Sequence, residues 1–297
     1  MVGIGNGTEG FGLRDDAAAL PLPAGGPLLA SVDSVVAGVH VDLAFCSPGD
    51  VGWKALMGAL SDLAAMGAAP LGALVALCVP DGDGDGALAL GVMEGVAAAA
   101  ARTGCPIVGG DLSASAVLVV TVTVLGGVGE GATPVARAGA RPGDALFVTG
   151  PCGGSAAGLR ALRAGDTADA AAAAYRRPTA RLREGAAARE GGAHAMIDVS
   201  DGLALDLHRL ADASGVGFEL DTVPLAPGAT LEEALGGGED YELLLAVAEG
   251  DADTLYGAFE AAGLRPPWRL GRVVEDRALR RLAGTDLGRL GWLHQLG

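Results

Sequence analysis

Apolar and polar residues follow one another along the chain in blocks that are typical of a mixed α/β protein. Residues 50–67 predict an amphipathic helix, because apolar positions recur there every three or four residues. Residues 87–103 predict a second helix, which Gly104 would end. Short apolar runs, rich in β-branched residues, predict strands over residues 28–32, 71–79, 107–108, 117–125 and 145–149. The alternation of strands and helices predicts sheets covered by helices.

A glycine- and proline-rich segment divides this pattern in two. Residues 126–142 hold seven Gly or Pro residues between two strand-like runs. A chain of 297 residues is long enough for two domains of ordinary size. We therefore expect an N-terminal domain over residues 1–136 and a C-terminal domain over residues 137–297.

Composition and charge exclude several classes of function. The formal net charge is −16 and Lys54 is the only lysine, so the chain would repel a nucleic-acid backbone. The longest apolar runs are well short of the roughly 20 residues of a membrane-spanning helix. The N-terminus lacks the basic and apolar regions of a signal peptide. We expect a cytoplasmic protein that binds neither nucleic acid nor membrane.

Familiar nucleotide and nucleophile motifs are absent from the sequence. A phosphate-binding P-loop would need a Gly-Lys-Ser/Thr sequence, but Lys54 lies between Trp53 and Ala55. No Gly-x-Ser-x-Gly elbow and no Cys-x-x-Cys pair occurs. The glycine-rich turn over residues 149–155 connects a strand to a helix and could present N–H groups to an anion, although a plain turn is the better explanation.

Carboxylates in apolar surroundings are the most unusual feature of the chain. They occur in LRDDAAAL, SVDSVV, ALSDLAAMGA, VGGDLS, MIDVSDGLALDL and GGGEDYELLL. A single Asp at a strand end or helix start is usually a cap or turn residue, but Asp62 lies inside a predicted helix. We place Asp33 and Asp111 at strand ends. Hard divalent cations such as Mg²⁺ would compensate a cluster of buried carboxylates.

These stretches, in this order, resemble the thiamine-monophosphate kinases. That family belongs to a superfamily that includes aminoimidazole ribonucleotide synthetase and selenophosphate synthetase. The resemblance runs from about Leu13 to Trp292, and its most specific segments are GWKALMGALSDLAAMGAAP, IDVSDGLALDL and GGGEDYELLL. It implies an α+β fold of two mixed α/β domains, with N-terminal sheets that pair across a homodimer and a C-terminal αβ sandwich. It also implies ATP-dependent, Mg²⁺-dependent phosphorylation of thiamine monophosphate to thiamine diphosphate.

The resemblance assigns roles to particular residues. Those that match the family's ligands for several Mg²⁺ ions are Asp16, Asp33, Asp62, Asp111, Asp198 and Asp201. Those that match ATP contacts are Gly110, Arg137 and Ser200, and those that match the thiamine monophosphate site are His40, Glu239 and Trp292. Because the acceptor is itself an ionised phosphate, we expect direct in-line transfer, carried by alignment and charge neutralisation, with no separate catalytic base.

Two alternatives stay open. Another member of the superfamily would act on a different phosphate or carboxyl acceptor; selenophosphate synthetase is disfavoured because its reactive N-terminal Cys or selenocysteine and Lys have no counterpart. A non-catalytic nucleotide-binding protein is suggested by Arg14 and Val32, which replace a Gly and a Thr of the family pattern.

Overall fold

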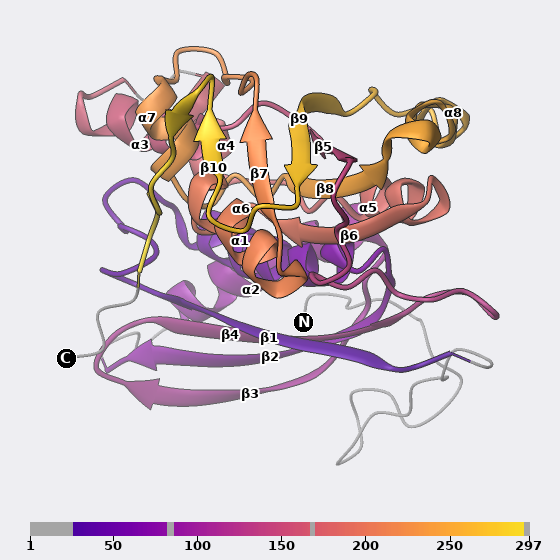
Figure 1. Ribbon diagram of the computed structural model, residues 1–297. Coiled ribbons are helices and arrows are strands. Elements are labelled where there is room, and N and C mark those ends of the chain that lie inside the picture. The colour runs from indigo at the N-terminus through magenta and orange to yellow at the C-terminus, as the bar shows by residue number, and fades with distance from the viewer. Residues whose placement is uncertain (1–25, 82–85, 167–169, 294–297) are drawn as a thin grey trace. The chain divides into compact units, whose positions relative to one another are not determined.

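The chain forms two compact units in the computed structural model, which describes residues 26–81, 86–166 and 170–293 (Figure 1). Among the described residues, the first unit runs to Leu63 and from Ala68 to Thr133, and the second comprises Ala64–Gly67 and the residues from Pro134 onward. The domain boundary expected after residue 136 stays a prediction. In the described residues, no helix is both long and apolar enough to cross a membrane.

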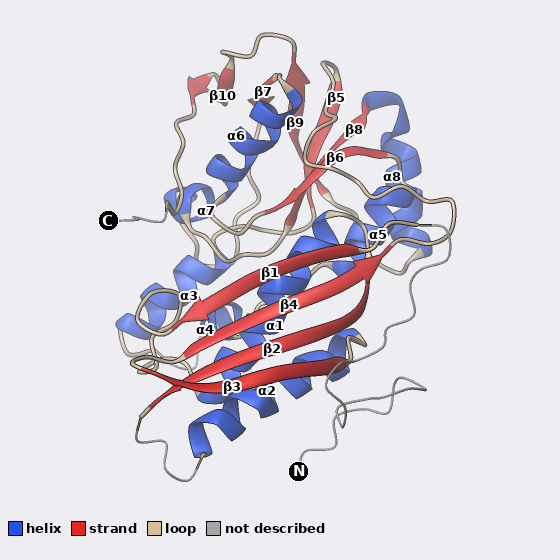
Figure 2. Ribbon diagram, turned by 90° about the horizontal axis from the view of Figure 1, so that it is seen from below, coloured by secondary structure: helices blue, strands red, loops and turns tan. Residues whose placement is uncertain are grey.

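The first unit is a four-stranded sheet with helices on one face (Figure 2). Its elements are β1 (Leu29–Val36), α1 (Pro48–Ala65), β2 (Ala69–Pro80), α2 (Ala87–Thr103), β3 (Ile107–Ser115) and β4 (Val119–Gly127). The strand order is β1-β4-β2-β3, in which only β2 and β3 run parallel. Figure 2 shows α1 and α2 behind this sheet.

Local sequence explains where α1 begins and how closely α1 and α2 pack. Ser47 and Asp50 cap α1 reciprocally: the Asp50 N–H donates to Ser47 Oγ (3.2 Å), and the Ser47 N–H donates to Asp50 Oδ2 (3.1 Å). Pro48 follows the cap, where its missing N–H costs nothing. A Cβ at Gly52 would lie 1.9 Å from the Val92 carbonyl oxygen, so α1 and α2 approach through glycine.

Both helix predictions are confirmed. Leu56, Leu60 and Leu63, which define the predicted apolar face of α1, are at most 1% exposed. Helix α2 spans the predicted residues and ends at Gly104, whose φ of 69° lies in the left-handed region.

The strand-end positions expected for Asp33 and Asp111 were wrong. Asp33 lies in the middle of β1, because the next three residues continue to pair with Thr121, Val120 and Val119 of β4. Asp111 lies in the middle of β3, which stays paired with β2 as far as Ser115. Val35 and Val36, which follow Asp33, favour a strand, whereas residues 112–115 are kept in β3 by backbone pairing with β2.

The second unit contains a seven-stranded sheet in the order β11-β10-β7-β9-β5-β8-β6. Its strands are β5 (Asp144–Val148), β6 (Ala193–Asp198), β7 (Gly217–Leu220), β8 (Leu243–Ala248), β9 (Trp268–Val274), β10 (Arg280–Leu282) and β11 (Thr285–Asp286). Its helices are α3 (Gly154–Arg163), α4 (Ala170–Arg176), α5 (Leu182–Glu190), α6 (Leu203–Ser214), α7 (Leu231–Gly236), the 3₁₀ turn η2 (Glu249–Asp251) and α8 (Ala252–Ala261).

Apolar residues cover both faces of this sheet. Successive residues of β5 alternate between two cores: Leu146 and Val148 pack in the core that contains α6 residues, and Phe147 packs in the core with α5 and α8 residues. Every residue of β5 is buried, as expected for a central strand with helices on both faces. The result is the αβ sandwich expected for the C-terminal domain.

A buried histidine joins α6 to the last strands of this unit. His208 Nδ1 lies 2.7 Å from Arg280 Nη1, and because arginine only donates, Nδ1 accepts. The other ring nitrogen, Nε2, therefore donates to the Leu287 carbonyl oxygen (2.9 Å). Burial lowers the pKa of His208, with the Arg280 charge acting in the same direction and the Leu287 bond opposing it.

This network predicts a loss of stability in mild acid. Because the folded-state pKa of His208 lies below 6.5, the unfolded chain takes up the proton first, and stability falls as pH drops through that value. Thermal unfolding of the wild type should therefore depend more steeply on pH between about 7.5 and 5.5 than that of His208→Gln, which keeps a neutral donor and acceptor. Equal slopes would contradict the assignment.

Candidate functional site

Two candidate metal ligands of the first unit lie on the helix-covered face of its sheet. Ser31 Oγ donates a short hydrogen bond to Asp62 Oδ2, which ties β1 to α1. Asp33 is two residues beyond Ser31 on the same strand, so its side chain projects from the same face. Asp33 and Asp62 are both partly exposed.

The third candidate ligand of this unit lies far from the other two. Asp33, Val122, Val75 and Gly110 form one row across the four strands, so β1 and β3 are separated by three strand spacings, or about 14 Å. Asp111 belongs to the next row and projects from the opposite face, where it is exposed and accepts a bond from Ser113 Oγ (2.8 Å). A single copy of this unit therefore does not bring Asp33 and Asp111 together.

Gly110 and His40 have local structural contacts of their own. A Cβ at Gly110 would lie 2.1 Å from the Val75 carbonyl oxygen, so strand packing by itself requires glycine there. His40 follows β1 in a turn, and its Nδ1 accepts the Val36 N–H (3.0 Å). This bond fixes the ring and assigns the other ring nitrogen as the one that carries hydrogen in the neutral form.

In the second unit, the candidate ligands lie between β6 and α6. Asp198 is the last residue of β6 and is 6% exposed, whereas Ser200 and Asp201 in the following turn are partly exposed. Arg137 is exposed, and the preceding residue, Ala136, accepts the Met196 N–H (3.0 Å) and so places Arg137 beside β6.

Two residues that the sequence analysis did not single out organise this turn. Asp206 Oδ2 accepts the N–H groups of Asp201 (2.9 Å) and Gly202 (3.2 Å), which caps the start of α6. Arg209 Nη1 donates to Asp201 Oδ2 (2.5 Å) and to Asp206 Oδ1 (2.6 Å). Burial raises the pKa of Asp206, although the Asp201 N–H and Arg209 lower it. The spacing of three residues between Asp206 and Arg209 was the available signal.

Main-chain bonds bring the three candidate segments of the second unit together. The Glu239 N–H donates to the Ser200 carbonyl oxygen (2.7 Å), and the Trp292 N–H donates to the Asp201 carbonyl oxygen (2.8 Å). Glu239 is partly exposed and Trp292 is 50% exposed. The Ser200–Asp201 turn is thus contacted by both candidate substrate-binding residues of this unit.

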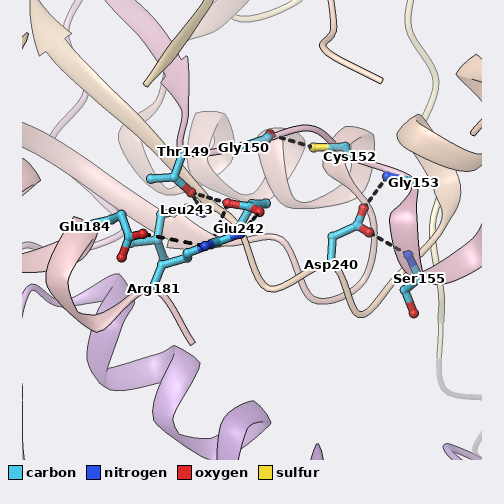
Figure 3. A network of polar contacts seen from close by, with 10 residues as sticks. All are labelled: Thr149, Gly150, Cys152, Gly153, Ser155, Arg181, Glu184, Asp240, Glu242 and Leu243. Carbon is cyan, nitrogen blue, oxygen red and sulfur yellow. Dashed lines mark hydrogen bonds and ion pairs between the residues drawn. The ribbon is translucent and has the colours of Figure 1, made fainter. Parts of the chain in front are cut away.

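The N–H groups of the glycine-rich turn 149–155 already have an anionic partner. Asp240 Oδ2 accepts the Gly153 N–H (2.5 Å) and Oδ1 accepts the Ser155 N–H (3.1 Å), at the start of α3 (Figure 3). Burial raises the pKa of Asp240 to about 6, although these backbone bonds lower it. A side chain of the protein therefore occupies the anion site that this turn was considered to offer.

A second carboxylate next to Asp240 holds an ion pair. Glu242 is 4% exposed and accepts from Arg181 Nε (2.9 Å), Arg181 Nη2 (2.5 Å) and Thr149 Oγ1 (2.6 Å). Figure 3 shows Arg181 and Thr149 on either side of this carboxylate. Asp240 and Glu242 thus attach one short segment to two other parts of the unit.

The predicted metal ligands are distributed over both units. Asp33, Asp62 and Asp111 belong to the first, Asp198 and Asp201 belong to the second, and Asp16 lies outside the described residues. Within the part of the chain that the structure describes, no three His, Cys, Asp or Glu side chains converge as a metal site. By donor type, the carboxylates fit a hard divalent cation, which prefers oxygen ligands.

Comparisons with known proteins cover almost the whole chain. Residues 14–128 match the N-terminal domain of AIR synthase related proteins, and residues 141–283 match the C-terminal domain. The thiamine-monophosphate kinase of Methanospirillum hungatei is 37% identical over 292 residues, which cover 94% of this chain and 92% of the relative.

Solved structures give the same result. The crystal structure of thiamine-monophosphate kinase from Stenotrophomonas maltophilia superposes with a TM-score of 0.83 at 32% identity, covering 94% of this chain and 92% of the other. AaThiL complexed with AMPPCP and TMP superposes with a TM-score of 0.80 at 31% identity and the same coverage. By sequence and by fold, this chain belongs to the thiamine-monophosphate kinase family, within the AIR synthase related proteins.

Proposed function

We propose that the chain transfers the γ-phosphoryl group of ATP to thiamine monophosphate, giving thiamine diphosphate and ADP. The observation that carries the proposal is a 37% identity to a thiamine-monophosphate kinase over 94% of the chain, with the fold of AaThiL complexed with AMPPCP and TMP. Most of the candidate site residues that the structure describes are partly or fully exposed, and Asp198 is the buried exception among them.

We assign the carboxylates to metal binding and their neighbours to the nucleotide. The proposed Mg²⁺ ligands are Asp16, Asp33, Asp62, Asp111, Asp198 and Asp201, and the proposed ATP contacts are Gly110, Arg137 and Ser200. Two like unit charges 4 Å apart repel by about 4 kcal/mol at an effective dielectric constant of about 20, so bare carboxylates would repel both phosphorylated substrates. Bound Mg²⁺ would neutralise that charge and bridge carboxylates to phosphates.

Substrate recognition is assigned to His40, Glu239 and Trp292. Thiamine monophosphate carries a cationic thiazolium ring, which suits the charge of Glu239 and the aromatic face of the half-exposed Trp292. The acceptor is a phosphate oxygen that is largely ionised near neutral pH, so no side chain has to remove a proton. The residues of the site therefore act by orienting the two phosphates for in-line attack.

We further propose that two copies of the chain complete the site. Asp33 and Asp111 lie on opposite edge strands and project from opposite faces of one sheet, so a partner's edge would be needed to combine them. Among the described strands, β1 and β3 each pair on one side only. The face away from α1 and α2 exposes Val32 (63%) and Leu74 (39%), which supports burial against a second copy. The joined sheets expected of a homodimer account for these observations.

The first experiment is a turnover assay with thiamine monophosphate, ATP and Mg²⁺, in which thiamine diphosphate is measured by chromatography. We expect product with thiamine monophosphate, none with thiamine, and none after EDTA removes the metal. A folded, ATP-binding protein without turnover would instead support the non-catalytic alternative or a different acceptor.

Two further measurements on the same preparation test the finer proposals. Sedimentation velocity should report a dimer of the 29.1 kDa chain, and an active monomer would contradict the shared site. Inversion of configuration at a chiral γ-phosphate would support direct in-line transfer, whereas retention would indicate a phosphoenzyme.

A further inference from the structure

The segment that carries Glu239 has a strained backbone. Among the described residues, the non-glycine residues with positive φ are Glu239 (66°), Tyr241 (52°) and Ala283 (49°). A left-handed conformation costs a residue with a side chain roughly 1–2 kcal/mol. Two of the three, Glu239 and Tyr241, lie within one tripeptide, next to the turn that holds Ser200 and Asp201. Strain of this kind persists only where the surroundings enforce it.

Contacts on two sides enforce this conformation. On one side, the Glu239 N–H donates to the Ser200 carbonyl oxygen (2.7 Å) and the Tyr241 N–H donates to the Val199 carbonyl oxygen (2.9 Å). On the other side, the Asp240 carboxylate accepts the N–H groups of Gly153 and Ser155 at the start of α3 (Figure 3). Strained residues thus alternate with residues whose side chains are anchored.

The Asp240 contact crosses a long stretch of chain. Helix α3 begins after Gly153, which has no side chain to cap it, and the cap comes instead from a residue more than 80 positions later. A cap that served α3 alone would contribute about 1 kcal/mol to stability and could be supplied locally. Here the same bond determines where the backbone on both sides of Asp240 lies.

We propose that Asp240 is a positioning residue for substrate binding, and that its bond to the α3 N-terminus holds Glu239 against the Ser200–Asp201 turn. This inference rests on the proposed function, in which Glu239 contacts thiamine monophosphate. Removing the anchor would let Glu239 and Tyr241 relax toward ordinary backbone conformations and withdraw from the Ser200 and Val199 carbonyl groups. Loss of substrate affinity, rather than loss of fold, is the expected consequence.

The test compares Asp240→Asn with a matched control, Asp144→Asn, in the full-length protein. Asp144 is also buried (3% exposed) in the second unit and accepts a backbone N–H, from Arg141 (2.8 Å), but it contacts none of the proposed site residues. For Asp240→Asn we expect the KM for thiamine monophosphate to rise at least about tenfold, with the KM for ATP within about twofold of the wild type. Asp144→Asn should change neither KM.

Equal rises in both KM values, or unchanged KM values together with a loss of thermal stability like that of the control, would assign Asp240 a purely structural role and overturn the proposal. If Asp240→Asn does not fold, Asp240→Glu is measured in its place. It keeps the charge but adds a methylene that displaces the loop, so the same separation of KM values is expected.

Amide hydrogen exchange distinguishes failure of this inference from failure of the proposed function. In Asp240→Asn, the Glu239 and Tyr241 amides should exchange at least about tenfold faster than in the wild type, and in Asp144→Asn they should not. This measurement needs no substrate. If the wild type has no kinase activity, the proposed function fails, and unchanged exchange at these two amides would still overturn the anchoring role of Asp240.

Discussion

Asp62→Asn is expected to lower kcat/KM by about 10³-fold or more while the protein stays folded. The substitution removes a negative charge with almost no change in volume. Ser31 Oγ donates to Asp62 Oδ2, and an amide oxygen can accept the same bond, so β1 and α1 should stay joined. The lost property is the charge that the proposed Mg²⁺ site requires, which acts on the transition state.

Steady-state kinetics and thermal unfolding together test this expectation. Glu94→Gln is the matched control, because Glu94 is an exposed carboxylate on α2 of the same unit. The control should keep wild-type kinetics, and both variants should unfold within a few degrees of the wild type. If Asp62→Asn retains near-normal turnover, then Asp62 does not bind the metal and the ligand assignment for the first unit is wrong.

Arg181→Met is expected to cause the largest loss of stability, about 3 kcal/mol. It would leave the Glu242 carboxylate, whose side chain is 5% exposed, with Thr149 as the remaining partner described above. Breaking a buried ion pair typically costs about 3–5 kcal/mol, and the lower end applies because the Arg181 side chain is 32% exposed. A loss of about 3 kcal/mol corresponds to a fall of roughly 6–12 °C in the unfolding midpoint.

A second substitution separates the uncompensated charge from lost packing. In Arg181→Met/Glu242→Gln the buried charge is absent, so at least half of the lost stability should return. Arg269→Met is the control, since Arg269 pairs with Glu249 where both side chains are exposed (44% and 57%), and it should cost less than about 1 kcal/mol. Unfolding followed by far-UV circular dichroism measures all three variants. A double variant no more stable than Arg181→Met would show that packing, not charge, explains the loss.

Much of the local structure could be predicted from the sequence because its causes are local. The apolar spacing of Leu56, Leu60 and Leu63 identifies α1 and its buried face, and Gly104 identifies the end of α2. The order of the aspartate motifs identifies the family, and the comparisons confirm it. The predicted roles of the individual site residues stay predictions.

Long-range features could not be predicted in this way. Asp33 and Asp111 were placed at strand ends, but pairing with β4 and β2 continues both strands beyond them. The spacing of Asp206 and Arg209 was present in the sequence, but their contacts with the Asp201 turn come from the placement of α6. The partner of the 149–155 turn, Asp240, comes from a distant part of the chain.

The sequence by itself determined helices α1 and α2, the approximate positions of strands β1 to β5, the family and the set of candidate carboxylates, because spacing and residue type express those directly. Only the tertiary structure decided which carboxylates share a face, which are held by arginine, and which one caps α3. The physical reason is that strand register and helix placement join residues far apart in the chain, and no local pattern records those pairings.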